Sequence, residues 1–159
     1  MKGCLLDQDY VQPIIEKLLH RANSHVHVLT KPYFPGDRSI GGKFGMNSRT
    51  ITLYIQEIEE QCIELFGSLQ PIESYIQIIF AHELGHAHDP MLEMLADELE
   101  QCSDSLQCAR IALRIEENAW EYARDLLPDV ELFIFETILD RSLEAYYDAL
   151  NAYQTGNIA

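Results

Sequence analysis

The 159 residues are enough for one domain with a buried core, and a hydrophobic share of 47% excludes a disordered chain. No apolar run is long enough to span a bilayer, and acidic Asp7 follows the start too closely for a secretory signal. We therefore expect a cytoplasmic protein that forms a single domain over residues 1–159, without a membrane segment.

The net charge of −15 is distributed unevenly along the chain. Residues 1–54 carry seven Lys/Arg and four Asp/Glu, whereas residues 55–159 carry four Lys/Arg and twenty-two Asp/Glu. The acidic part should repel the phosphate backbone, so we expect no direct binding of nucleic acid. Two interpretations of this acidic part stay open: a solvated surface, or a docking surface for a basic partner.

Cysteine usage fits a reducing compartment, where we expect free thiols. Because none of the cysteines forms a C-x-x-C pair, a cysteine zinc site is not indicated. Cys102 and Cys108 are six residues apart and could be bridged only if a turn separates them. The four cysteines are Cys4, Cys62, Cys102 and Cys108.

The first third of the chain predicts a helix followed by a small sheet. Asp9 to Ala22 places apolar residues three and four apart, which predicts a helix. His25 to Thr30 alternates as a strand does, and Lys31 to Gly42 is rich in proline and glycine and predicts a loop. Lys43 to Asn47 and Thr50 to Ile55 predict a β-hairpin, joined by a turn at residues 47–49.

The remaining two thirds predict helices. An acidic helix at about Glu57 to Phe66 ends at a glycine, and a strongly apolar helix opens at Pro71 and ends near His88. Three further helices are predicted at Met91 to Gln101, Asp104 to Leu127 and Val130 to Tyr153. This order indicates an α+β fold, mainly helical, with a small β-sheet packed beside the 71–88 helix.

The 71–88 helix contains the most informative motif of the chain, H-E-x-x-H at residues 82–86. Residues four apart lie on the same face of a helix, so His82 and His86 can present two imidazoles to one metal ion. Glu83 then lies beside the open coordination position. This spacing is typical of zinc hydrolases, in which the glutamate activates a water molecule at the metal.

A catalytic zinc usually has three protein ligands, so a third ligand must come from another helix. Glu116 is the best candidate, because it stands at the start of E-x-x-A-x-x-Y-A over residues 116–123. The motif at 82–86, this pattern about thirty residues later and the Leu126-Leu127-Pro128 that follows it resemble the ImmA/IrrE family of small zinc metallopeptidases. The similarity covers residues 76–128 well.

The resemblance implies a zincin-like domain of the gluzincin type, in which Glu116 is the third zinc ligand. Packing supports this choice, because the small side chains of Ala119 and Ala123 share the face of Glu116 and let two helices approach closely. Glu117 is the alternative ligand, one residue round the helix. Trp120 departs from the family pattern, which has a small polar residue at that position.

The sequence also contains histidines and tyrosines that could contribute to such a site. His88 lies off the ligand face and is expected at the helix end. A peptidase also needs a hydrogen-bond donor for the oxygen that becomes negative in the transition state. The sequence does not choose among four candidate donors, which are His25, His27, Tyr146 and Tyr147.

The sequence thus predicts a zinc-dependent metallopeptidase with Zn²⁺ as cofactor, since histidine and carboxylate ligands suit zinc. The resemblance implies a protein or peptide substrate in the cell, such as a basic DNA-binding repressor of a phage or mobile element. Two alternatives stay open: a catalytically silent zinc-binding regulator that docks a basic partner, and hydrolysis of a non-peptide amide. The sequence does not indicate an oligomeric state.

Overall fold

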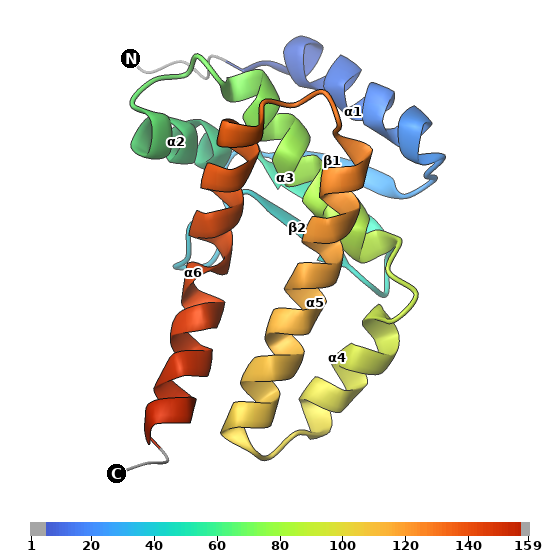
Figure 1. Cartoon of the computed structure of the whole chain (residues 1–159). Coiled ribbons are helices and arrows are strands. Elements are labelled where there is room, and N and C mark those ends of the chain that lie inside the picture. The colour runs from blue at the N-terminus through green and yellow to red at the C-terminus, as the bar shows by residue number, and fades with distance from the viewer. Residues whose placement is uncertain (1–5, 157–159) are drawn as a thin grey trace.

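The computed structural model describes residues 6–156, and these form six α-helices and one three-stranded sheet. The fold is a mixed α+β arrangement, as the sequence predicts (Figure 1). In chain order the elements are α1 (Gln8–Ala22), β1 (His27–Lys31), β2 (Gly42–Gly45), β3 (Thr50–Tyr54), α2 (Ile55–Phe66), α3 (Ile72–Ala87), α4 (Leu92–Gln101), α5 (Ser105–Leu126) and α6 (Leu132–Gly156).

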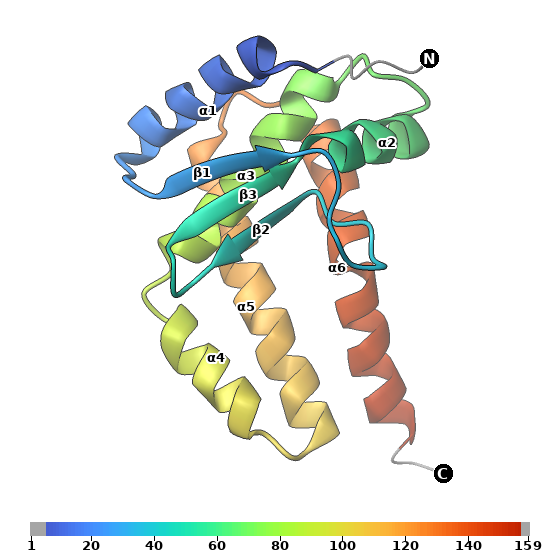
Figure 2. The same cartoon turned by 180° about the vertical axis from the view of Figure 1, so that it is seen from behind.

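The sheet has the order β1-β3-β2, with β3 in the centre (Figure 2). The predicted hairpin is confirmed, since β2 runs antiparallel to β3 and pairs Phe44 with Ile51. β1 adds to the other side of β3 in parallel, with Val28 opposite Ile51. The side chains of Ile51 and Leu53 are fully buried, and they join the sheet to the helical core.

Helix α3 occupies the centre of the molecule, between the sheet and the other helices (Figures 1 and 2). The sequence predicts a single apolar face on this helix, but in the structure the helix is buried on nearly all sides. Ile78 and Phe80 point to nearly opposite sides of the helix, and both are fully buried, as is Leu84 one turn beyond Phe80. A helix enclosed in this way positions its side chains rigidly, and it is the helix that contains the 82–86 motif.

Helices α4, α5 and α6 extend beyond the sheet toward one end of the molecule (Figure 1). α5 packs along α3, and α6 packs along α5 while also contacting α3. β2 is the edge of the sheet on the side of these long helices (Figure 2). The second half of α3 is therefore bordered by an edge strand and two helices.

Local signals account for where most elements begin and end. The carboxylates of Asp7 and Asp104 accept hydrogen bonds from Tyr10 N and Gln107 N, capping α1 and α5. Gly67 ends α2 with a φ of 77°, the left-handed region that glycine adopts without strain. Predicted and observed ends agree within about three residues. Ile55, however, starts α2 instead of ending the strand.

The expectation of four free thiols is wrong for one pair, because Cys102 and Cys108 form a disulfide. Cys102 caps the end of α4 and Cys108 lies in the first turn of α5, so the turn between the helices brings their Cα atoms within 5.7 Å. Cys62 is a buried free cysteine, while Cys4 lies outside the described residues. Within residues 6–156, no helix has the length and apolar character required to cross a bilayer.

Candidate metal centre

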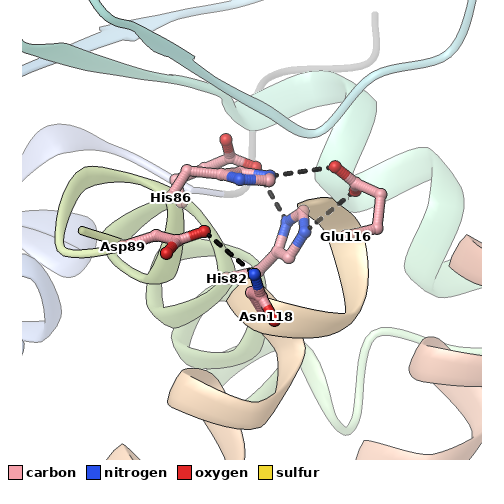
Figure 3. A network of polar contacts seen from close by, with 6 residues as sticks. His82, His86, Asp89, Glu116 and Asn118 are labelled. Atoms are coloured by element: carbon pink, nitrogen blue, oxygen red, sulfur yellow. Dashed lines mark hydrogen bonds and ion pairs between the residues drawn. The ribbon is translucent and has the colours of Figure 1, made fainter. Parts of the chain in front are cut away.

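His82, His86 and Glu116 converge between α3 and α5, as Figure 3 shows. One carboxylate oxygen of Glu116 lies 3.1 Å from Nε2 of His82, and the other lies 3.1 Å from Nε2 of His86. One donor atom from each of the three side chains lies within 4.8 Å of the others. The two Nε2 atoms therefore point at a common place, which the Glu116 carboxylate also reaches.

A glycine permits the close approach of the two helices. A Cβ atom placed on Gly85 would lie 2.8 Å from the Cα of Ala119 and would overlap the carbonyl oxygen of that residue. Since backbone atoms cannot move aside as a flexible side chain can, only glycine fits at position 85. The Gly85–Ala119 contact lies one turn from the carboxylate and brings Glu116 within reach of both histidines.

The ring of His82 is held from two sides. The indole of Trp120 stacks on it with ring centroids 4.4 Å apart and an angle of 21° between the planes. Nδ1 of His82 lies 3.0 Å from Oε2 of Glu83. Histidine ligands of metals usually donate their second ring N–H to such an acceptor, which orients the ring. Glu83 therefore has two possible roles, as a base beside the cluster and as a support for His82.

The charges of these groups are strongly coupled. Burial acts to lower the pKa of His82, but the carboxylates of Glu83 and Glu116 more than offset it and raise that pKa to about 9. Burial acts to raise the pKa of Glu116, but hydrogen bonds from His82 and His86 hold it well below its ordinary value. The two carboxylates therefore favour a positive charge at this cluster, which a bound cation can supply.

The cluster opens into a cavity of about 940 Å³, which both long helices, the edge strand and α2 also border. Glu83 lines this cavity and its residue is only 5% exposed. Gly42 of β2 lies close above α3, since a Cβ atom there would be 3.0 Å from Cγ of Glu83. The edge strand therefore runs directly past the cluster.

The structure separates the other candidates that the sequence raised. Glu117 is exposed and is not part of the three-residue group, so Glu116 is the carboxylate that the fold brings to the histidines. His88 caps the end of α3 and stacks on Tyr122, away from the cluster as expected. His25 and His27 are exposed residues at the β1 end of the sheet.

The position of Trp120 beside the cluster was not predicted from the sequence. From the sequence, Trp120 is only a departure from a family pattern. Trp120 follows Glu116 by four residues on α5, so both side chains lie on the same face of that helix. Helical spacing from Glu116 was therefore the signal that could have identified it.

The donor set fits a metal ion. Two neutral imidazoles and one carboxylate are a usual ligand set of catalytic zinc, which keeps a fourth position open. Here both Nε2 atoms and the carboxylate lie at a cavity wall, where a fourth position has access to a ligand. The chemistry of the residues thus allows zinc without identifying the metal. No protein family, curated protein or solved structure matches this chain.

Proposed function

We propose that this protein is a zinc-dependent metallopeptidase with a zincin-like fold. The observation that carries the proposal is the convergence of His82, His86 and Glu116 at the wall of a large cavity, with Glu83 beside them. A zinc ion bound by these three side chains would polarise a carbonyl group and acidify a water molecule. The resemblance of residues 76–128 to the ImmA/IrrE family points to the same activity.

Glu83 is the general base of the proposed reaction. Its carboxylate takes a proton from the attacking water and transfers it to the leaving amine. Its location at the cavity wall, nearly buried and next to His82, supports this assignment. The indole of Trp120 and the carboxylate of Glu83 also hold the His82 ring in the orientation that metal binding requires.

The substrate is an extended protein segment that pairs with β2. This strand is an edge of the sheet, and residues Gly42 to Phe44 line the cavity that contains the cluster. Strand addition at such an edge supplies backbone hydrogen bonds and aligns a peptide along the strand. We propose a specific cytoplasmic target, such as a basic DNA-binding repressor, whose charge complements the acidic residues 55–159.

The direct test compares the zinc-loaded wild type with Glu83→Gln, using candidate repressors and a mixed peptide library with mass spectrometry as the readout. The glutamine oxygen can still accept a hydrogen bond from Nδ1 of His82, so the variant should keep its zinc. Loss of a general base lowers the rate by about 10²- to 10⁴-fold. Equal cleavage by both proteins would show that the assigned mechanism is wrong.

The same experiment separates the peptidase from a silent zinc-binding regulator. A regulator would bind a basic partner equally well with and without Glu83, and neither protein would release a product. The silent regulator would be excluded if the wild type cleaves a substrate, a zinc chelator abolishes this cleavage and added zinc restores it.

A further inference from the structure

The proposed reaction needs a hydrogen-bond donor that the metal ligands do not provide. When water adds to a peptide carbonyl, the π electron pair moves onto oxygen, and donors aimed at this negative charge stabilise it. We propose that the hydroxyl of Tyr146 is this donor and binds the carbonyl oxygen opposite Glu83. This inference rests on the proposed function and adds a catalytic residue to it.

The first argument is the face of α6 on which Tyr146 lies. The α6 residues that border the cavity recur three and four apart, as one face of a helix does. Tyr146 is therefore directed toward the space that His82, Glu83 and Glu116 border from the other side. The α6 residues on this face are Arg141, Ser142, Ala145, Tyr146 and Ala149.

The neighbouring tyrosine is excluded by the same geometry. Tyr147 follows by one residue, which is about 100° round a helix of 3.6 residues per turn. It is 43% exposed and borders a different, shallow hollow with Asp140 and Glu144. This tyrosine is a matched control, because it has the same chemistry, helix and sequence neighbourhood but no access to the cluster.

The second argument is that the Tyr146 hydroxyl is available. Within residues 6–154, no hydrogen bond engages it, although its ring packs against the core. Tyr75 borders the same cavity, but its hydroxyl donates to Oε1 of Gln61 at 3.2 Å and the residue is only 3% exposed. Of these two tyrosines, Tyr146 has the free donor.

The electrostatic surroundings agree with a donor role. Burial raises the pKa of Tyr146, and the carboxylates of Glu116 and Glu83 raise it further, while Arg38 lowers it. The phenol therefore keeps its proton, which it must have in order to donate. Arg38 also borders the cavity and places a cation near the site where negative charge develops.

The two histidines that were candidate donors do not lie at the cavity, as Tyr146 does. His25 and His27 are exposed and lie at the start of β1, which β3 separates from β2. Neither borders the cavity. Of the four donors that the sequence left open, the tertiary structure thus favours one.

The test uses the cobalt-loaded protein, whose visible spectrum reports ligands at the metal. Dimethylphosphinate, a small tetrahedral anion, is the probe for the oxyanion position, and acetohydroxamate is the probe for metal access alone. Tyr146→Phe should weaken phosphinate binding about tenfold or more, as expected for a lost hydrogen bond to a charged group. Acetohydroxamate affinity should stay unchanged, and Tyr147→Phe should match the wild type with both probes.

Equal phosphinate affinity of wild type and Tyr146→Phe would overturn the inference and leave the peptidase proposal standing. Failure of the wild type to bind phosphinate while it binds acetohydroxamate would also overturn the inference and leave the peptidase proposal standing. Failure to bind cobalt would overturn both proposals. On any peptide that the zinc enzyme cleaves, Tyr146→Phe should lower kcat with little change in KM, because the hydrogen bond forms mainly in the transition state.

Discussion

Single side chains at the candidate metal centre each make several contacts. Glu116 joins both histidines across the interface of two helices, with each of its oxygens 3.1 Å from one Nε2. His82 is in contact with Glu83, Glu116 and Trp120, which together determine its charge and its orientation. Changes at these residues should therefore affect metal binding before they affect the fold.

Glu116→Ala should abolish tight zinc binding, whereas Glu117→Ala should retain one zinc per chain. The reason is that Glu116 reaches both imidazoles while Glu117 is exposed. Metal analysis after dialysis against a weak chelator measures both variants. Loss of zinc in Glu117→Ala alone would reverse the ligand assignment.

Zinc binding near pH 7.5 should release close to one proton from His82, because the pKa of this residue is raised to about 9 and zinc binds the neutral ring. The apparent affinity should then rise by up to about tenfold per pH unit below pH 9. Calorimetry in buffers of different ionisation enthalpy counts the protons. Affinity that is independent of pH between 7 and 9 would contradict the charged form of His82.

The raised pKa of His82 has the opposite effect on the stability of the protein without metal, which should fall as the pH rises. The folded pKa of His82 lies above the ordinary value of about 6.5, so its stabilising contribution is complete below pH 6.5. It is lost as the pH rises through about 9. Metal-free protein should therefore lose stability over the pH range in which zinc binding grows stronger.

At the scale of elements, local sequence signals predicted most of the helices and the hairpin. Capping residues such as Asp7 and Asp104 and the glycine at position 67 act within one turn, so they can be recognised without the fold. The burial of α3 on nearly all sides and the parallel addition of β1 depend on distant segments, which periodicity does not report. The disulfide between Cys102 and Cys108 likewise needed the turn between α4 and α5.

Gly85→Ala should lower the free energy of unfolding by about 1–3 kcal/mol, the usual range for overpacking a core. Alanine normally favours a helix interior over glycine, so a loss here identifies the contact with the Ala119 backbone as the cause. The variant should also bind zinc less tightly, because α5 carries Glu116. Urea unfolding of the metal-free and zinc-loaded forms measures both effects.

Glu73→Ala is the control for this substitution, since it introduces alanine at an exposed position in the first turn of the same helix. It should change stability only slightly. A Gly85→Ala protein as stable as wild type would mean that the helices can separate without cost.

At the scale of the whole molecule, the candidate metal site lies between α3 and α5, which pack against each other. A metal that binds only the folded state stabilises it, and the effect grows with the ratio of free metal to Kd. Glu116 contacts both histidines directly, so the chain should remain folded, but be less stable, when metal is removed.

Free zinc at 1,000 times its Kd should therefore stabilise the fold by about 4 kcal/mol. Thermal unfolding with zinc and with a chelator measures the change in Tm. Glu83→Gln should keep most of this shift and Glu116→Ala should lose it. A chelator that leaves the wild-type Tm unchanged would argue against a metal in the folded protein.

The sequence by itself determined the local features of this protein: the i, i+4 histidine pair, the glutamate between them, the helix ends and the division of charge. These features depend on residues within a few positions of one another, so spacing and residue type are sufficient to identify them. Only the tertiary structure favoured Glu116 over Glu117 and brought Tyr146, but not Tyr147, to the cavity. Neighbours on one helix differ by about 100° in direction, and only the packing of helices distant in sequence decides which of them faces the site.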